Sequence, residues 1–277
     1  MSKHIAIGSA ALAAALVVAG CADDETTTAS LRVAHLSATA PAVDFCIAPH
    51  GSGSFSGPIM KSLGETAGLA YGEVTKYLSV SAIQYDVRLV APNAASCATP
   101  LAALPDFTSL PALPADGHAT VAAIGLLGDA TYPFQLKAYI DEAAAPTGKI
   151  KLRVVHDSPG TPAVDVGLGT GTGFVPLFVN VSYPGITAAG GNIDANGYLT
   201  ADPINASVAN PVLVTARVNG TTTDALTIPL TFPAPAGTVA TAFATGLLAS
   251  TATPLQVLLC LDNAPPTGSL STCILLP

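Results

Sequence analysis

Residues 31–47 read LRVAHLSATAPAVDFCI, and residues 152–168 repeat this stretch as LRVVHDSPGTPAVDVGL. Nine of the 17 paired positions are identical, at a constant offset of 121 residues. The same offset relates the GLL of residues 125–127 to the GLL of residues 246–248, and Asp141 to Asp262. Self-similarity at a constant offset indicates that one structural unit occurs twice. We therefore expect two domains of one fold, over residues 31–148 and 149–277.

Each unit has the pattern of an all-β fold. Short segments alternate apolar and polar residues, as half-buried strands do. The 23 Pro and 25 Gly interrupt the chain frequently, and no segment keeps a helical apolar period. Short strands between Pro and Gly turns are typical of β-sandwiches, so we expect two tandem sandwiches, immunoglobulin-like or Greek-key. The expected strands are 31–36, 42–48, 74–80, 85–91, 119–127, 134–140, 151–156, 163–168, 174–181, 211–218, 225–232, 239–248, 255–261 and 272–276.

The N-terminus has the parts of a secretory signal peptide. Lys3 precedes an apolar run over residues 5–19, which is shorter than the roughly 20 residues needed to cross a bilayer. The run ends in Val-Ala-Gly-Cys (18–21), which resembles the lipobox of bacterial lipoproteins. The resemblance implies removal of residues 1–20 and acylation of Cys21, which would anchor the protein to a membrane. An ordinary signal peptide with a chance cysteine is the alternative.

The residues after Cys21 predict a tether and an address. Residues 22–30 read ADDETTTAS and contain no large apolar side chain, so we expect a lipidated, disordered acidic tether over 21–30. Alanine rather than aspartate follows Cys21, which resembles the outer-membrane sorting pattern of enterobacterial lipoproteins. We therefore expect an exported protein anchored to the cell envelope, with the outer membrane favoured, either periplasmic or surface-exposed.

Charge excludes one class of partner. The formal net charge is −8, and the ten Lys and Arg are scattered, so the chain has no basic patch for nucleic acid. Residues 237–259 lack charge and are long enough to cross a membrane. They also contain five Thr and Pro254 among strand-favouring residues. We expect strands there, with a second membrane span as the alternative.

Four cysteines remain after Cys21, namely Cys46, Cys97, Cys260 and Cys273. An even number in an exported protein favours disulfides, for which three pairings are possible. The domain division assigns Cys46 to Cys97 and Cys260 to Cys273; four free buried thiols are the alternative. No Cys-x-x-Cys spacing or nearby His supports a zinc site, and we expect neither a metal nor another cofactor.

Three polar residues of the first copy recur in the second: His35 as His156, Ser37 as Ser158, and Asp44 as Asp165. Ser, His and a carboxylate could form a catalytic triad, but no Gly-x-Ser-x-Gly nucleophile elbow is present. We expect structural roles instead, with Ser or Asp tying the Pro-containing turn and His contacting a neighbouring strand. The sequence therefore predicts a protein that is not an enzyme.

Other candidate sites are weaker. Residues 194–202 resemble a calcium loop but lack most EF-hand carboxylates, and a hydrogen-bonded surface loop is the preferred interpretation. The glycines at 167, 169, 171 and 173 do not match the dinucleotide fingerprint. Without Trp, the candidate sugar-stacking residues are Tyr71, Tyr77, Tyr85, Tyr183 and Tyr198.

The repeated sequence motif also resembles a known family. Leu-Arg-Val-x-His-x-Ser-x-x-x-Pro-Ala-Val-Asp (31–44) and Ala-Tyr-Gly-Glu-Val-Thr-Lys-Tyr-Leu (70–78) are similar to the domain-of-unknown-function family 4397. These domains occur in exported bacterial proteins, often in tandem and as lipoproteins, and carry no established activity. In the second copy, Ser-Tyr-Pro-Gly-Ile-Thr (182–187) and an insertion at 188–197 leave the strand order open.

These features together predict a membrane-anchored envelope or cell-surface lipoprotein with a non-enzymatic binding, adhesion or spacer role. Its expected partners are the lipid membrane, through acylated Cys21, and other envelope or surface components. The alternatives are a hydrolase using the His, Ser and Asp residues, or a calcium- or glycan-binding module.

Overall fold

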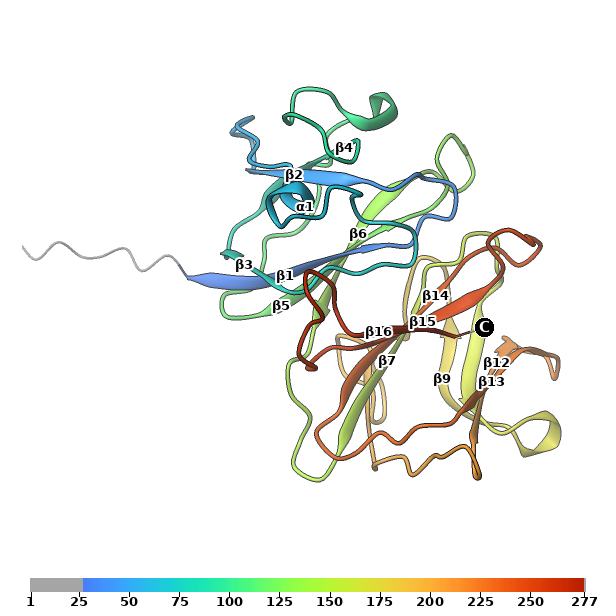
Figure 1. The fold of residues 1–277 in the computed structure, drawn as a ribbon. Coiled ribbons are helices and arrows are strands. Elements are labelled where there is room, and N and C mark those ends of the chain that lie inside the picture. Colours follow the sequence, from blue (N-terminus) through green and yellow to red (C-terminus); the bar gives the residue numbers. More distant parts are fainter. Residues whose placement is uncertain (1–26, 277) are drawn as a thin grey trace, which may run out of the picture.

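The computed structural model describes residues 27–276, which form an all-β protein. The predicted signal peptide, Cys21 and most of the predicted tether lie outside these residues. The expected fold class is confirmed, and strands occupy nearly all of the expected segments. Figure 1 shows the strands stacked in layers across the molecule.

The first unit has two layers of strands. A sheet with the order β3-β1-β5-β6 faces a small sheet made of β2 and β4, and in the larger sheet β1 and β5 run parallel. A single helical turn, α1 (Ile59–Ser62), follows β2. The strands are β1 (Thr28–His35), β2 (Asp44–Pro49), β3 (Leu78–Ser81), β4 (Tyr85–Val90), β5 (His118–Ile124) and β6 (Gln135–Asp141).

The second unit repeats this plan with more strands. One sheet has the order β10-β7-β14-β15-β16, with β11 also paired to β7, and the other has the order β13-β12-β8-β9. β7 and β14 run parallel, as β1 and β5 do. The strands are β7 (Ile150–His156), β8 (Val164–Leu168), β9 (Val175–Val181), β10 (Gly185–Ile186), β11 (Tyr198–Ala201), β12 (Val212–Val218), β13 (Asp224–Leu230), β14 (Val239–Thr245), β15 (Gln256–Leu261) and β16 (Cys273–Leu276).

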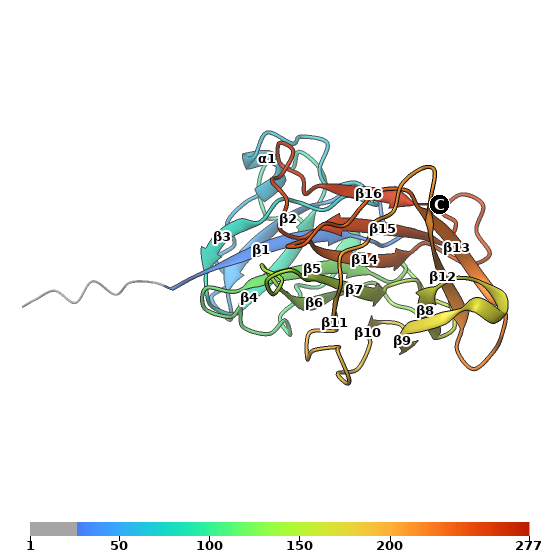
Figure 2. The same cartoon turned by 90° about the horizontal axis from the view of Figure 1, so that it is seen from below.

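The two larger sheets pack face to face in the middle of the molecule. One face of the β1-β5 sheet contacts β2 and β4, and the other contacts the β7-β14 sheet. Leu36 and Ile124 from the first unit are buried here against Val155 and Phe243 from the second. The molecule is therefore a stack of four sheets, with β2 and β4 outermost on one side and β8, β9, β12 and β13 on the other (Figures 1 and 2).

Buried charges join the two middle sheets in a repeated pattern. Arg32 of β1 donates to Asp262 of the second unit at 2.6 Å, and Arg153 of β7 donates to Asp141 of the first unit. Tyr77 bonds Asp141 and Tyr198 bonds Asp262, each at 2.8 Å. Each of these residues lies 121 positions from its counterpart, so the interface has pseudo-two-fold symmetry.

Burial alone would raise the pKa of the Asp141 carboxyl. The charges of Arg153 and Arg32 outweigh this effect and hold that pKa below its usual range. The cluster is therefore charged and fully enclosed. Removing one charged residue from such a cluster strongly destabilises the folded protein.

Three details differ from the sequence-based expectation. Thr28–Ser30 were expected to be disordered, but they belong to β1 and pair with β3, which buries Ala29. The strand expected over 74–80 is shorter, because β3 begins at Leu78. β10 and β11, both on the edge of β7, were not predicted.

The segment 237–259, considered as a second membrane span, forms β14 and most of β15 in the middle of a sheet. Among the described residues, no helix has the length and apolar character needed to cross a membrane.

Both predicted disulfides are confirmed. Cys46 is bonded to Cys97, and Cys260 is bonded to Cys273 across neighbouring strands β15 and β16. Within residues 27–276, each strand ladder joins partners from one predicted domain, although an isolated bridge joins Thr75 to Leu270. The boundary between residues 148 and 149 stays a prediction.

Candidate functional site

The repeated histidines hold the proline-containing turn. The Nε2 of His35 donates to the Pro41 carbonyl at 2.9 Å, and the Nε2 of His156 donates to the Pro162 carbonyl at 3.1 Å. Both side chains are buried, and burial lowers the pKa of each imidazole. Ser or Asp was expected to tie this turn; the turn carbonyl is bound by His instead, but in the second copy Ser158 also bonds Thr161 of the turn at 2.7 Å.

Both repeated serines bind a second turn. The Ser37 hydroxyl donates to the Gly125 carbonyl at 2.7 Å, and the Ser158 hydroxyl donates to the Gly246 carbonyl at the same distance. These glycines follow β5 and β14, so each serine links its own loop to the end of a neighbouring strand. Neither serine hydroxyl is hydrogen-bonded to the histidine of its copy, so these repeated residues do not form a paired nucleophile and base.

The repeated aspartates have different roles in the two copies. Asp44 accepts backbone N–H bonds from Met60 at 2.8 Å and Lys61 at 2.9 Å, which ties β2 to the helical turn. Asp165 accepts bonds from the Asn180 backbone and the Asn219 amide. In the second copy the segment after β8 forms a short 3-10 turn (Gly171–Gly173) that Asp165 does not bind, and its aspartate holds loops instead.

The loop at 194–202 is held by protein groups. One oxygen of Asp194 accepts the backbone N–H groups of Asn196 and Tyr198, each at 3.0 Å, and the other accepts Lys151 at 2.9 Å. Asp202 pairs with Lys149. Within residues 27–276, no three His, Cys, Asp or Glu side chains gather as metal ligands.

The candidate sugar-stacking tyrosines are used inside the protein. Tyr77 and Tyr198 bond the buried aspartates, Tyr71 contacts Thr245, and Tyr85 donates to the Ser81 carbonyl. Tyr183 lies edge-on to His156 and to another tyrosine ring. All five are buried or half-buried, so they do not form an exposed stacking platform.

The second sandwich contains a cavity of about 370 Å³ between its two sheets. Drug-sized ligand pockets occupy about 300–1,000 Å³, so this space is large enough for a small ligand. The wall is almost entirely carbon. Its principal residues are Leu152, Val154, Ala240, Ala242, Ala244, Val257, Leu259 and Ile274 from the β7-β14 sheet, and Val164, Val166, Val214, Ala216, Leu226 and Ile228 from the β8-β12 sheet.

Strand alternation reveals that this space is open. On β15, Leu258 and Cys260 face the interface between the units and are buried. Val257 and Leu259 face the cavity, yet they are only half-buried. Apolar side chains in the interior of a sandwich are normally sealed from water, so the cavity wall is a reachable apolar surface.

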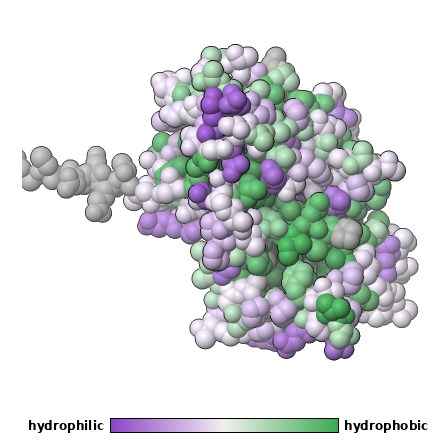
Figure 3. Space-filling model, viewed as in Figure 1, coloured by the Kyte–Doolittle hydropathy of each residue, from purple (hydrophilic) through white to green (hydrophobic). Residues whose placement is uncertain are grey.

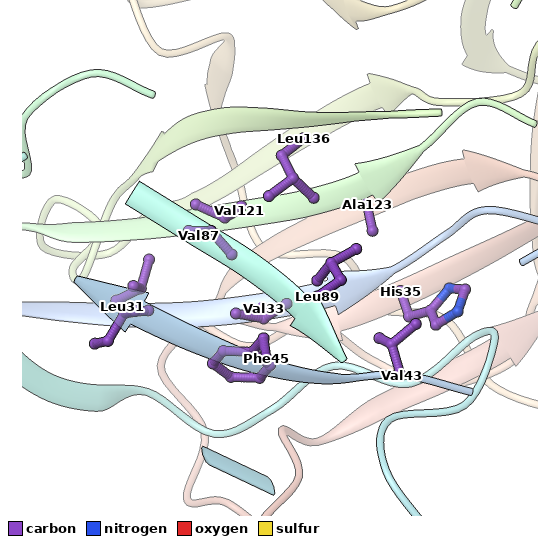
Figure 4. Close-up of a pocket in the computed structure, with 11 residues that line it drawn as sticks. Leu31, Val33, His35, Val43, Phe45, Val87, Leu89, Val121, Ala123 and Leu136 are labelled. Atoms are coloured by element: carbon purple, nitrogen blue, oxygen red, sulfur yellow. The ribbon is translucent and has the colours of Figure 1, made fainter. Parts of the chain in front are cut away.

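The first sandwich provides an internal comparison. Its corresponding cavity is only about 20 Å³, because Phe45, Val121 and Leu136 converge in it (Figure 4). The residues 121 positions later are Val166, Ala242 and Val257, and each is smaller. Leu31 and Val33 are buried in the first copy, whereas their counterparts Leu152 and Val154 are half-buried. Smaller side chains have therefore hollowed the second copy of the same fold.

The few polar side chains near the cavity are already engaged. Arg153 pairs with Asp141 and bonds Thr241, and Thr161 bonds Ser158 at 2.7 Å. His156 bonds the turn carbonyl described above, and its lowered pKa leaves it uncharged near neutral pH. The wall can therefore bind through apolar contact, but it offers no free charge.

The cavity reaches the surface beside the C-terminal strand. Ile274 of β16 lines it and is 44% exposed. Hydrophobic residues gather on the surface around β15 and β16, where the space-filling view is hollowed (Figure 3). At the other end, Val164, Phe178, Val181 and Leu199 form a buried cluster that closes the sandwich.

Sequence reasoning did not find this cavity. The signal was the loss of bulk between copies at equivalent positions, as from Phe45 to Val166. Reading that signal requires knowing that both positions face into the sandwich, which depends on strand register.

A family model described as "Domain of unknown function (DUF4397)" matches residues 60–167. The match begins in α1 and ends in β8, and it confirms the resemblance for that segment. A solved structure of a candidate cell adhesion protein from Bacteroides fragilis aligns with 82% of this chain and 96% of its own, at 10% identity and a TM-score of 0.20. No curated protein matched the sequence.

Proposed function

We propose that this chain is a lipid-anchored protein of the cell envelope that binds an apolar molecule in its second sandwich without catalysing a reaction. The observation that carries the binding role is the open aliphatic cavity, which the first copy of the fold lacks. The repeated His, Ser and Asp residues support a non-catalytic role, because their hydrogen bonds hold turns and loops.

The folded part is extracytoplasmic. Two disulfides bond all four cysteines outside the predicted anchor, and disulfides persist in oxidising compartments. The anchor itself rests on the sequence Val-Ala-Gly-Cys at 18–21. A tethered binding protein gains from this arrangement, since the anchor concentrates its cavity beside the membrane.

Metabolic labelling tests the anchor. Cells that express the chain and grow on an alkyne analogue of palmitate should label the wild-type protein, and Cys21→Ala should abolish the label. The double variant Cys46→Ala/Cys97→Ala is the control, because it removes cysteines without touching the lipobox and should keep the label. Labelling that survives Cys21→Ala would show that Cys21 is not the lipidation site.

A fluorescent apolar probe tests the binding role. The full chain carrying Cys21→Ala is purified without detergent, delipidated, and titrated with N-phenyl-1-naphthylamine, which fluoresces when it leaves water. We expect saturable fluorescence at one site per chain. A response that never saturates would indicate adsorption to the surface, and no response to any apolar probe would overturn the binding role.

A further inference from the structure

We propose, resting on the binding function above, that the cavity holds one linear alkyl chain of a fatty-acid-like amphiphile, which enters between β13 and β16. This assignment names the ligand class and its entrance. Three features of the second sandwich carry it: the chemistry of the wall, the shape of its floor and the position of the opening.

The wall excludes ligands that need hydrogen bonds at depth. Its residues are mostly Leu, Val, Ile and Ala, and the polar atoms of Arg153 and Thr161 are taken by protein partners. A buried sugar, nucleotide or peptide group would lose its hydrogen bonds to water without replacement, which disfavours its binding here. A methylene chain has no such groups, and each methylene that leaves water favours binding.

The floor provides a smooth channel. Three alternate residues of β14, Ala240, Ala242 and Ala244, face the cavity. Because each has only a methyl group, the space directly above this central strand is clear along the strand direction. The volume of about 370 Å³ is near the lower end for ligand pockets, which suits a single chain.

The opening lies where both sheets end. β13 and β16 are the last strands of their sheets, and both contribute residues to the cavity. Ile274 is exposed at this edge, whereas the opposite end is closed by the cluster around Phe178. The polar head of the ligand therefore stays in water at the β13–β16 edge, since the described wall offers no unpaired cation to draw a carboxylate inside.

An inserted peptide strand is the competing occupant, and the edges of the sheets disfavour it. Pro229 lies in β13 and lacks a backbone N–H, which weakens this edge as a partner for another strand. β16 contains only four residues. A strand inside the cavity would need regular ladder bonds from these edges, whereas an alkyl chain needs none.

The duplication supplies the test variant. Val166→Phe/Ala242→Val gives the second copy the residues that fill the first, at Phe45 and Val121. The matched control makes the same two changes on exposed positions, as Val179→Phe/Ala225→Val. Both are made in the delipidated Cys21→Ala chain and titrated with cis-parinaric acid, a linear fluorescent fatty acid. We expect Val166→Phe/Ala242→Val to bind cis-parinaric acid at least tenfold more weakly than the parent, and the control to bind it unchanged. The melting temperatures of both variants should be no lower than that of the parent.

Competition experiments identify whether the bound alkyl chain comes from a free fatty acid or from a membrane phospholipid. Palmitate should displace cis-parinaric acid in solution, and the protein should not extract pyrene-labelled phospholipid from phosphatidylethanolamine vesicles. Extraction from vesicles, without displacement by palmitate, would overturn the free single-chain ligand. Binding of N-phenyl-1-naphthylamine without any binding of cis-parinaric acid would refute the linear chain while leaving the proposed function intact. Equal binding by Val166→Phe/Ala242→Val would place the ligand elsewhere.

Discussion

The second copy carries Asp157 where the first copy carries Leu36, and both side chains are buried between the two middle sheets. One oxygen of Asp157 accepts the Tyr139 hydroxyl at 2.7 Å, and the other has no hydrogen-bond partner among residues 27–276. Burial raises the pKa of this carboxyl to about 7. The carboxyl therefore holds a proton in the folded protein over a pH range in which it is ionised in the unfolded chain.

This proton predicts how stability depends on pH. Between the ordinary pKa of 3.8 and about 7, the folded state binds the extra proton, so the contribution of Asp157 to the free energy of unfolding falls as pH rises. The slope is roughly 1.4 kcal/mol per pH unit within this window, and it vanishes above it. Asp157→Asn keeps an acceptor for Tyr139 and removes the titration. Its stability relative to the wild type should rise from pH 4 to 7 and then level off.

Urea unfolding at several pH values measures this difference. The comparison with the wild type is needed because His35 and His156 have the opposite effect. Burial lowers their pKa values, so their contribution to stability rises with pH up to about 6.5. The variant retains both histidines, and their effect cancels in the difference. Parallel pH profiles for the two proteins would show that Asp157 does not titrate as described.

Gly246 combines a left-handed backbone with a close approach. Its φ is +84°, and an added Cβ would lie 2.0 Å from the Pro254 carbonyl oxygen. Gly237 has a φ of +93° but open space around it. Gly237→Ala should cost only the roughly 1 kcal/mol of a left-handed backbone. We expect Gly246→Ala to destabilise the protein by clearly more than this. Thermal unfolding of both variants gives the comparison, and equal losses would mean that the close approach is relieved without cost.

At the scale of strands, the buried ion pairs connect sheets from different units. Asp262→Ala leaves the buried cluster with two arginines and one aspartate, because Arg32 then faces only Asp141 at 3.6 Å, and we expect this to cost about 3–5 kcal/mol. Replacing both, as Arg32→Met/Asp262→Leu, should recover most of that loss, since apolar residues of similar volume suit an enclosed site. Asp202→Ala breaks the exposed pair with Lys149 and should cost far less. Urea midpoints measure all three, and a small effect of Asp262→Ala would show that water reaches Arg32.

The strands of the repeated motif could be predicted because their apolar alternation is local. The pairing of Cys46 with Cys97 also followed, since the repeat divides the cysteines between units. The partner of Arg32 could not be found in this way, because Asp262 lies 230 residues away. β10 has only two residues and carries no pattern, so its pairing with β7 depends on tertiary context. The cavity is a matter of missing volume, which a pattern of apolar residues does not report.

At the scale of the whole molecule, the interface predicts how the protein unfolds. Each middle sheet uses one face inside its own unit and the other against the second unit. Unfolding of one unit alone would expose Leu36 or Phe243 of the other to water and would break the pairs between Arg32 and Asp262 and between Arg153 and Asp141. The lost apolar burial alone amounts to several kcal/mol, which is a large part of the stability of an ordinary domain. The two units should therefore unfold together, although their strand ladders are separate.

Scanning calorimetry tests this coupling. We expect one transition whose calorimetric enthalpy equals its van't Hoff enthalpy, at about 0.7 kcal/mol per residue over the whole folded part. Phe243→Ala removes a ring from the interface and should lower the midpoint and separate the transition into two, because each unit then gains less from the other. Asp202→Ala should keep a single transition. Two well-separated transitions in the wild type would mean that each sandwich is stable alone and that the interface only orients them.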